Sequence, residues 1–468
     1  MKNARDIGSW SRQYRGRAGK AAGLSLVATA ALLGSFAGSS AASPAGSHSA
    51  LSASESSSST SGSRCPTGGT GVTSAQANIA VTIINVTGVV TNATIGVPSA
   101  QTQEADWSVV ARSINSSGGA GCRQLALHFF EVNPLDGAGT QEDCLSIAAS
   151  HPLLVLDVGV LTALGASDCI PAHKVALASG FLTSEELTKY YPYYLAIGDV
   201  QNDIIRNGVL GLSQLGYFKS SKGFRKLGVL YHSCNPANET AERTYLKKAG
   251  VPDSKIVVFS LGCPAGLQDT GASYQQAVLS FKNAGVTDVT ELNVAGLGGF
   301  TQIAQEQHFN PSYILVDDSF PTTPTNAQSA PDPTNFNGAI DVVSQAYGEQ
   351  STPGYKPDAG TAKCNAIYAK TGQPPVVKQP DGYGGAVCNY LWFTQELLNH
   401  APELKSSALA SAMHSIGTFE SAYPGGPIHF ADAPRGAAYG VDSWRVIRFS
   451  AVCKCWHVVN PTFNAPLK

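Results

Sequence analysis

Charged residues are scarce in this sequence, and their signs nearly cancel. Asp, Glu, Lys and Arg make up 14% of the 468 residues, with 31 basic residues against 33 acidic ones. Domains that bind nucleic acids carry an excess of Lys and Arg on one face, which this balance does not support. We therefore expect no nucleic-acid partner.

Catalytic signatures are also missing. The chain contains no Gly-x-Ser-x-Gly elbow, no Gly-x4-Gly-Lys-Ser/Thr loop and no His-Glu-x-x-His pair. These motifs provide the nucleophile, the phosphate cradle or the zinc ligands of common enzyme classes. The run Gly296–Gly299 is rich in glycine but does not match the dinucleotide-binding pattern. We expect a binding protein rather than an enzyme, with no cofactor and no metal ion.

One apolar run lies near the N-terminus. Four basic residues between positions 12 and 20 precede Ala21–Ala37, and small residues follow it. This order is typical of a secretory signal peptide, here residues 1–42; a retained membrane anchor is the alternative, although the run is short and rich in Ala and Gly. Residues 43–75 are rich in serine, so we expect a disordered tether there. The sequence thus predicts export and an extracytoplasmic location.

Ten cysteines fit an exported chain, because an even number in an oxidising compartment favours disulfides. A metal site is the poorer interpretation, since Cys453-Lys-Cys455 lacks partner pairs at zinc spacing. One expected bridge joins the ends of two neighbouring strands, and a second joins two consecutive helices. A third expected bridge joins two consecutive helices of the first lobe. These pairs are Cys234–Cys263, Cys364–Cys388 and Cys144–Cys169, whereas the sequence assigns no partners to Cys65, Cys122, Cys453 and Cys455.

Strand and helix patterns alternate along most of the remaining chain. Short apolar runs suit buried parallel strands, and amphipathic segments between them suit covering helices. Strands are expected at residues 78–84, 124–130, 153–158, 174–178, 226–231, 255–259, 289–294 and 313–316. Helices are expected at residues 105–114, 142–149, 167–173, 202–216, 237–249, 274–283 and 302–307. This alternation predicts parallel sheets flanked by helices.

The alternation breaks after Phe320. Residues 321–337 form a loop pattern, and helices are expected at 339–347, 362–371, 384–400 and 404–415. Strand patterns follow at 425–430, at 439–449 and in the tail to His457. We predict an α/β protein with a first lobe over residues 76–216, a second lobe over 217–338, and residues 339–468 returning to both.

Several short segments resemble those of a known family. Asn85-Val-Thr-Gly88 resembles its "TG" loop, Val158-Gly-Val-Leu-Thr-Ala163 its "IG…S" turn, and Ala178–Thr188 its "SPGAT…LT" segment. Gly382–Ala386 is similar to its "YDA" helix start, and Gly426–Phe430 to its C-terminal hairpin. In order and spacing these segments resemble the type I periplasmic binding proteins, in particular the branched-chain amino acid (Leu/Ile/Val) substrate-binding components of ABC transporters.

The resemblance implies two hinged lobes with a ligand cleft between them. It further implies a monomer that captures a small molecule, an amino acid or a related compound, and presents it to an ABC-type permease in the membrane. An exported ligand-sensing domain without a transport role is one alternative, and an exported α/β hydrolase is another. An adjacent permease gene and ATPase gene would favour the transporter role.

Candidate ligand-binding residues of the first lobe follow its expected strands, because ligands of parallel α/β sheets bind beyond the carboxyl ends of the strands. Thr162 and Ala163 open a helix whose free N–H groups suit a carboxylate, or Thr162 is only a helix N-cap. Ser179 and Thr183 follow the next strand, and the resemblance places Thr183 in the ligand-hydroxyl region; an ordinary loop hydroxyl is the alternative. Thr87 is either a further ligand contact or a turn residue.

Candidates of the second lobe also lie at strand ends. Asn293 ends one strand, and Asp317, Asp318 and Ser319 follow another. A carboxylate in this place would pair with the ammonium group of an amino acid, for which Asp318 is the expected residue. A capping or solvated acidic pair is the alternative.

Overall fold

The computed structural model describes most of the chain from Cys65 on, including residues 65–75 of the expected tether, where Thr67–Gly68 form a short strand. The described residues are 65–87, 92, 97–134, 136–163, 165–180, 182–233, 236–262, 271–292, 297–316, 332–344, 356–379, 382–422, 426–433, 437–460 and 462–467. The expected signal peptide therefore lies outside them. Within these ranges, no helix has the length and apolar character needed to cross a lipid bilayer.

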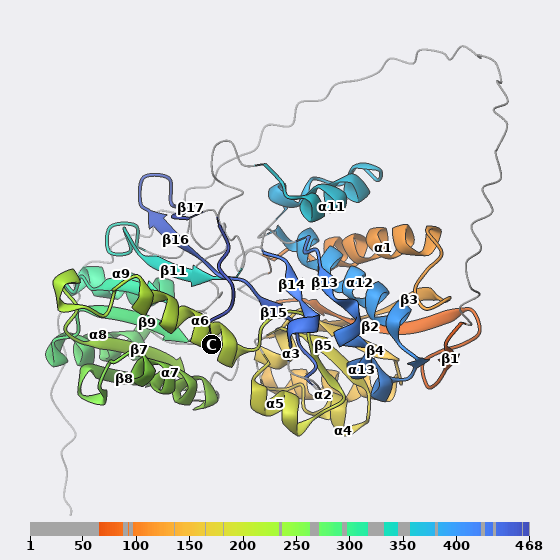
Figure 1. Cartoon of the computed structure of the whole chain (residues 1–468), viewed down its shortest axis with the longest axis horizontal. Helices are drawn as coiled ribbons and strands as arrows, with labels where there is room; N and C mark the ends of the chain where they lie inside the picture. The colour runs from red at the N-terminus through yellow and green to blue at the C-terminus, as the bar shows by residue number, and fades with distance from the viewer. Residues whose placement is uncertain are drawn as a thin grey trace, which may run out of the picture. The chain divides into compact units, whose positions relative to one another are not determined.

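Five parallel strands form the sheet of the first lobe, in the order β3, β2, β4, β5, β6. They run from orange to yellow in Figure 1. Because β3 and β4 lie on opposite sides of β2, the strand order reverses between β2 and β4. The strands are β2 (Gln76–Ile84), β3 (Gln124–Val132), β4 (Leu154–Asp157), β5 (Ala176–Ser179) and β6 (Tyr194–Ala196).

Helices cover both faces of this first sheet. Side chains alternate along β2, so that Ile79, Val81 and Ile83 enter one apolar core while Ala80 enters the other. Helix α1 packs in the first of these cores, and α2, α3, α4 and α5 pack in the second. The helices are α1 (Ala100–Ser116), α2 (Gly137–Ala149), α3 (Val160–Ala163), α4 (Cys169–Ala172) and α5 (Ser184–Lys189).

Seven strands form the sheet of the second lobe, in the order β17, β16, β11, β10, β9, β7, β8. Neighbouring strands from β8 to β11 are parallel, whereas β16 and β17 are added antiparallel. The strand order reverses between β7 and β9. The strands are β7 (Leu227–His232), β8 (Ile256–Leu261), β9 (Asp288–Leu292), β10 (Ser312–Leu315), β11 (Ile340–Val343), β16 (Arg445–Ser450) and β17 (Cys455–Val458).

The second sheet also has an apolar core on each face. Helices α8 and α9 pack in one core, with Phe281 and Phe300 among its buried side chains, and α7 packs in the other with Leu246. Helix α6, which the sequence leaves at the end of the first lobe, contributes Ile205 and Val209 to this second core. These helices are α6 (Gln201–Gln214), α7 (Pro236–Lys248), α8 (Gly271–Ala284) and α9 (Leu297–Glu306).

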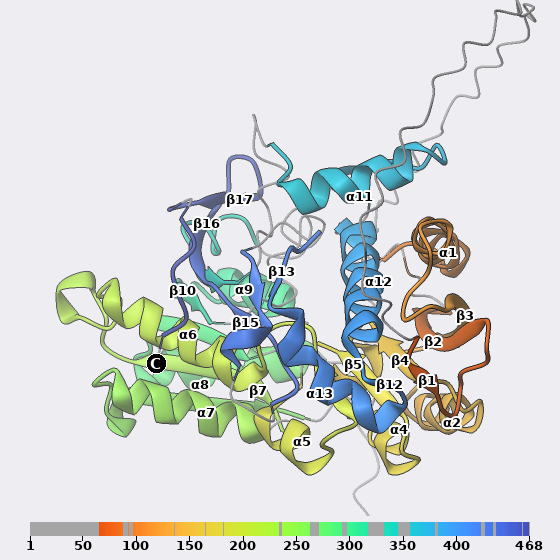
Figure 2. The same ribbon diagram turned by 45° about the vertical axis from the view of Figure 1, so that its right-hand side comes forward.

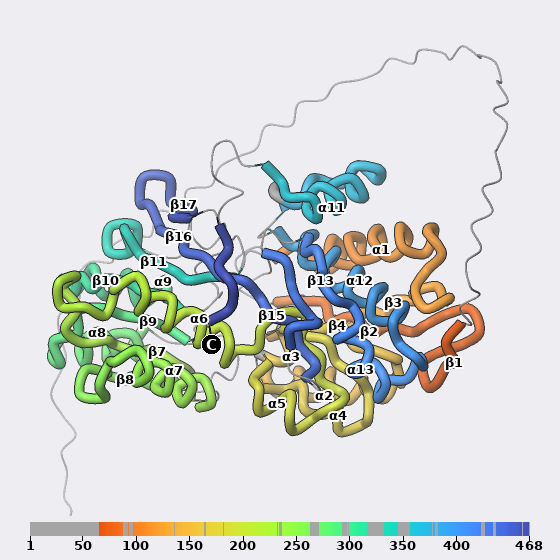
Figure 3. The backbone as a smooth tube through the Cα atoms, in the orientation of Figure 1, coloured from red at the N-terminus to blue at the C-terminus, as the bar shows by residue number. Residues whose placement is uncertain are grey.

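Residues after position 356 return to both sheets. Helices α11 (Ala359–Ala369), α12 (Tyr383–His400) and α13 (Ser406–Ile416) join the core that contains Trp107 of α1, whereas β16 and β17 extend the second sheet. Figure 2 shows α12 and α13 beside the strands of the first lobe, and the blue end of the tube in Figure 3 passes through both lobes. The fold is thus a two-lobed α/β structure with parallel sheets flanked by helices.

Short elements complete the architecture. β1 (Thr67–Gly68) pairs with β12 (Glu403–Leu404), which ties the start of the described chain to its C-terminal part. A small antiparallel sheet has β14 (Ile428–His429) between its two partner strands. The remaining elements are β13 (Thr418–Phe419), β15 (Val441–Asp442) and the 3-10 turns η2 (Ser220–Lys222), η3 (Asp253–Lys255), η6 (Val376–Lys378) and η8 (Phe430–Asp432).

One expected element is wrong. The sequence predicts a helix over residues 339–347, but Ile340–Val343 is strand β11, paired with β10 on one side and β16 on the other. All four residues of β11 are buried. The segment is only four residues long, and Asp341 interrupts its apolar residues, so no alternation distinguishes a strand from a helix here.

Four disulfides lie among the described residues. Cys144–Cys169 joins α2 to α4 and Cys364–Cys388 joins α11 to α12, and both are pairs that the sequence predicts. The other two bridges are Cys65–Cys122 and Cys453–Cys455, whose partners the sequence does not assign. The predicted pair Cys234–Cys263 lies outside the described residues.

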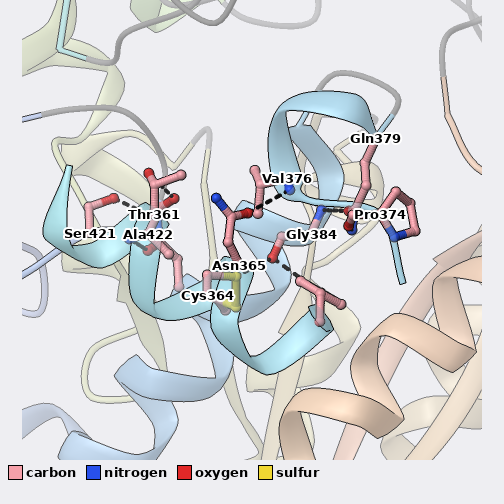
Figure 4. The surroundings of a disulfide bond; sticks show 12 residues. Thr361, Cys364, Asn365, Pro374, Val376, Gln379, Gly384, Ser421 and Ala422 are labelled. Atoms are coloured by element: carbon pink, nitrogen blue, oxygen red, sulfur yellow. Dashed lines mark hydrogen bonds between the residues drawn. A yellow bond between two sulfur atoms is a disulfide. The ribbon is translucent and has the colours of Figure 1, made fainter. Parts of the chain in front are cut away.

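The bridge between α11 and α12 is set in a network of polar contacts (Figure 4). The backbone N–H of Val376 donates to Oδ1 of Asn365 at 2.8 Å, and that of Gly384 donates to Oε1 of Gln379 at 2.7 Å. The hydroxyl of Thr361 donates to the carbonyl of Ala422 at 2.9 Å. These contacts fix the start of α12 and the segment before it, so the disulfide holds two elements that are also ordered by hydrogen bonds.

A buried carboxyl group in the first core gives the protein a pH-dependent stability. Asp106 of α1 is 1% exposed, and burial raises its pKa to about 7. Its Oδ1 atom has no hydrogen-bond partner among the described residues. In the unfolded chain the same group has its ordinary, lower pKa, so the folded state binds the proton more tightly. This contribution to stability is complete below about pH 4 and is lost as the pH rises through about 7.

The variant Asp106→Asn should therefore be more stable than the wild type at about pH 8, by up to about 4 kcal/mol, because the amide carries no charge to bury. Thermal unfolding of both proteins at about pH 5 and about pH 8 measures the effect. The wild type should be more stable at the lower pH than at the higher one, and this difference should be smaller in the variant. The exposed Asp432 supplies the control Asp432→Asn. A wild type whose melting temperature is no higher at the lower pH would contradict this origin.

Candidate functional site

The carboxyl edge of the first sheet holds a buried carboxylate at the place where the strand order reverses. Asp157 is the last residue of β4 and is fully buried. Its Oδ1 accepts hydrogen bonds from the hydroxyl of Thr82, at 2.9 Å, and from the backbone N–H of Leu161, at 3.2 Å. Thr82 belongs to β2, so the carboxylate joins the two strands on either side of the reversal.

The second oxygen of this carboxylate also accepts several hydrogen bonds. Oδ2 of Asp157 accepts from the N–H of Thr162 at 3.2 Å, from its hydroxyl at 3.1 Å, and from the hydroxyl of Ser179 at 3.0 Å. The chain turns at Gly159, whose φ of +96° suits glycine, and enters α3 directly afterwards. That turn aims the first free N–H groups of α3 back at the strand that precedes them, which is a favourable place for negative charge.

Two of the predicted ligand residues are thus brought together by the fold. Thr162 of α3 and Ser179 of β5 lie with their hydroxyl oxygens 2.9 Å apart, and the Thr162 hydroxyl is also 3.1 Å from the carbonyl of Gly180. Thr162 is 6% exposed and Ser179 is fully buried. Their polar groups are satisfied by the protein itself, and Asp157 occupies the helix N-terminus that the sequence offers to a ligand carboxylate.

A tyrosine from a distant part of the chain completes this network. The hydroxyl of Tyr390, in the middle of α12, donates to the backbone carbonyl of Asp157 at 2.7 Å. Burial raises the pKa of Tyr390 far above its ordinary value, so the group stays a neutral donor. Its ring also lies 6.0 Å from that of Trp107, which connects the network to the first core. Sequence reasoning missed both Asp157 and Tyr390.

The other predicted residues of the first lobe are not part of this network. Thr183 caps helix α5 in a capping box: its hydroxyl accepts from the N–H of Glu186 at 3.1 Å, and the Glu186 carboxylate accepts from the N–H of Thr183 at 2.8 Å. Thr87 is exposed, and its hydroxyl oxygen lies 3.5 Å from the Asn133 side-chain amide. Ala163 is the last residue of α3.

The predicted residues of the second lobe cannot be placed in the same way. Asn293, Asp317, Asp318 and Ser319 lie outside the described residues. The strands that precede them are as expected, since β9 ends at Leu292 and β10 ends at Leu315. The geometry available for the site is therefore that of the first lobe.

The network at the carboxyl edge is a rigid polar anchor rather than a reactive centre. One carboxylate receives hydrogen bonds from five donors, which fixes the ends of β2, β4 and β5. Satisfied buried networks of this kind define a unique local structure. The loops that continue from these strand ends are thereby held in place at the usual ligand-binding edge of such sheets.

Comparisons with known proteins agree with this architecture. No family model and no curated protein matches the sequence. Among solved structures, a fatty acid ABC transporter substrate-binding protein from Thermomonospora curvata is 14% identical, with a TM-score of 0.57 over 86% of this chain and 95% of its own. A possible leucine/isoleucine/valine-binding protein from Rhodopirellula baltica is 13% identical, with a TM-score of 0.60 over 83% and 97%.

A third similar structure binds a different molecule. The solute-binding protein of an ABC transporter from R. palustris, in complex with 4-hydroxybenzoate, is 11% identical, with a TM-score of 0.59 over 84% of this chain and 98% of its own. At identities this low the likeness concerns the fold, and the ligands named for the three proteins differ in chemistry. A type 1 periplasmic binding protein from Bordetella pertussis is also similar, with 14% identity and a TM-score of 0.58 over 84% of this chain and 100% of its own. The chain therefore has the two-lobed α/β fold of the type I periplasmic binding proteins, and the other three structural neighbours are substrate-binding components of ABC transporters or resemble them.

Proposed function

We propose that this protein is an extracytoplasmic solute-binding protein that captures a small molecule for an ABC-type importer. The observation that carries the proposal is the buried network of Asp157, Thr162 and Ser179, which lies where the strand order of the first sheet reverses. Open α/β sheets bind their ligands beyond the carboxyl ends of the strands at this point. The structural neighbours, substrate-binding proteins of ABC transporters, support the same role.

The ligand that we propose is an amino acid or a related compound. The N–H groups of Leu161 and Thr162 donate to Asp157, so a ligand carboxylate near α3 has to take its hydrogen bonds from other donors. A second carboxylate placed against Asp157 would also be repelled by it. We therefore expect neutral and zwitterionic ligands to bind at this edge more tightly than simple carboxylic acids of the same size.

A thermal-shift screen of the full chain tests this function. Amino acids, short peptides, amides, aromatic acids and fatty acids are added one class at a time, because a ligand that binds only the folded state stabilises it by mass action. A true ligand at about 100 times its dissociation constant adds about 2.7 kcal/mol to the free energy of unfolding. Calorimetry then has to give a saturable one-to-one isotherm. Failure of every class to shift the melting temperature would contradict the solute-binding proposal.

Transport and sensing make different demands on the loaded protein. An importer component stimulates the ATPase activity of its permease complex only when the ligand is bound, whereas a sensor without a transport role does not. Reconstitution with the permease and ATPase encoded beside this gene, if such genes are present, measures that stimulation directly. Ligand binding without stimulation would favour the sensing role and leave the binding function itself intact.

A further inference from the structure

The last β-hairpin carries an exposed disulfide at its turn. The turn between β16 and β17 contains Cys453, which is exposed, and Cys455 begins β17 and is 4% exposed. Trp456 is fully buried in the core of the second lobe that contains Phe281 and Phe300. Because side chains alternate along a strand, Cys455 and His457 lie together on the face opposite to Trp456. The two sulfur atoms and the imidazole thus gather at one corner of the hairpin.

This bridge differs from the other three in what it can stabilise. It spans a sequence separation of 2, whereas the others span 57, 25 and 24 residues. In the chain-entropy model the stabilisation by a disulfide grows with the length of the loop that it closes. The hairpin is in addition already held by the β16–β17 ladder, which pairs Ser450 with Cys455 and Phe449 with Trp456. Of the four disulfides, this bridge should therefore contribute the least to the stability of the folded protein.

The imidazole lies where a third ligand of a metal ion would lie. Nε2 of His457 is 3.2 Å from the sulfur of Cys453 and 3.6 Å from that of Cys455. Two ligands of a tetrahedral zinc ion, with bonds of about 2.1 Å to nitrogen and 2.3 Å to sulfur, lie about 3.5 Å apart. All three ligand atoms lie within 4.8 Å of one another, and the described residues contain no second group of three such side chains as close as this.

We propose that Cys453, Cys455 and His457 form a redox-gated site for a thiophilic metal ion such as Zn²⁺. In the oxidised protein the bridge keeps both sulfur atoms from binding a metal. In the reduced protein two thiolates and one imidazole form a three-ligand site, which leaves a fourth position of a tetrahedral ion for water or an incoming group. The sulfur atoms have to separate to about 3.8 Å, which the exposed position of Cys453 at the turn allows.

Opening of the site needs an external dithiol as the reductant. Its thiolate attacks the exposed sulfur of Cys453, which forms a mixed disulfide and releases Cys455 as a thiolate. The second thiol of the reductant then displaces Cys453, so the reductant leaves as a disulfide and the protein gains two electrons and two protons. The metal ion displaces those protons when it binds. The cysteines of the α2–α4 and α11–α12 bridges are at most 8% exposed and resist the same attack.

Differential alkylation of the full chain tests the gate. The protein is treated with a rising concentration of a dithiol, free thiols are alkylated, and peptide mass spectrometry identifies the labelled cysteines. Cys453 and Cys455 should be labelled at a dithiol concentration at least tenfold lower than that which opens Cys364–Cys388. If the Cys453–Cys455 bridge opens no earlier than the buried bridges, the gating part of the proposal is overturned.

Metal binding is then measured with Zn²⁺ alone, in competition with a chromophoric chelator. The mildly reduced protein should bind one Zn²⁺ more than the oxidised protein, and the double variant Cys453→Ser/Cys455→Ser should lose that ion after the same reduction. His457→Ala should weaken the binding at least tenfold, whereas His414→Ala, at an exposed histidine of α13, should leave it unchanged. Equal melting temperatures of variants and wild type confirm that each is folded. Zn²⁺ binding that is unchanged in the double variant, or absent from the reduced wild type, overturns the site.

Discussion

Replacement of Asp157 by Ala should lower the free energy of unfolding by about 4 kcal/mol, because five buried donors lose their acceptor at once. The donors are the hydroxyl of Thr82, the N–H of Leu161, the N–H and hydroxyl of Thr162 and the hydroxyl of Ser179. Urea denaturation followed by circular dichroism measures the change. Asp157→Asn keeps one acceptor oxygen and should give an intermediate loss.

Asp168 provides the matched control for this variant. Its side chain is 53% exposed and forms a 3.3 Å ion pair with Lys189. Exposed pairs contribute little, so Asp168→Ala should change the free energy of unfolding by less than about 1 kcal/mol. Any ligand found by the thermal-shift screen should bind Asp168→Ala normally and Asp157→Asn more weakly. Equal stability of Asp157→Ala and Asp168→Ala would show that the network does not anchor the strand ends.

Removal of the bridge between α11 and α12 should have the second largest destabilising effect. The variant Cys364→Ala/Cys388→Ala frees a loop with a sequence separation of 24, and both sulfur atoms lie in the first core, fully buried. The chain-entropy model gives a loss of about 3 kcal/mol for a loop of this length. Because α12 also supplies Tyr390, looser packing of α12 should weaken ligand binding as well.

The Cys453–Cys455 bridge at the turn between β16 and β17 provides the comparison for the Cys364–Cys388 bridge. Cys453→Ala/Cys455→Ala removes the same chemical group from a turn in which the sequence separation is 2, so its cost in stability should be much smaller. Chemical denaturation of both double variants under non-reducing conditions gives the two values. Losses of equal size would mean that loop length does not govern the contribution of these disulfides.

The alternating part of the fold could be predicted from sequence, since strands such as Leu227–His232 and helices such as Pro236–Lys248 carry strong local patterns. Strand β11 could not, because four buried residues show neither the period of a strand nor that of a helix. Its identity depends on the neighbours β10 and β16, of which β16 follows about a hundred residues later in the chain.

The candidate site was predictable only in part. Thr162 and Ser179 follow buried strands, and strand ends are where ligands of such sheets bind, so local patterns were sufficient to select them. Asp157 was overlooked because a single Asp at a strand end has many ordinary roles. Tyr390 carries no local signal at all, since it reaches the carbonyl of Asp157 across a separation of 233 residues. Contacts of that range depend on packing, which no local pattern specifies.

The return of the C-terminal segment to both lobes has a consequence for the synthesis of the chain. The core that contains Trp107 lacks Leu391 and Phe393 until α12 has left the ribosome. The core that contains Phe281 and Phe300 lacks Trp456 until β17 has left it. These two cores therefore cannot be completed on a nascent chain until synthesis is nearly finished. Such long-range contacts also slow folding. A chain that stops short of β17 would have an unfinished sheet edge, which is a template for aggregation.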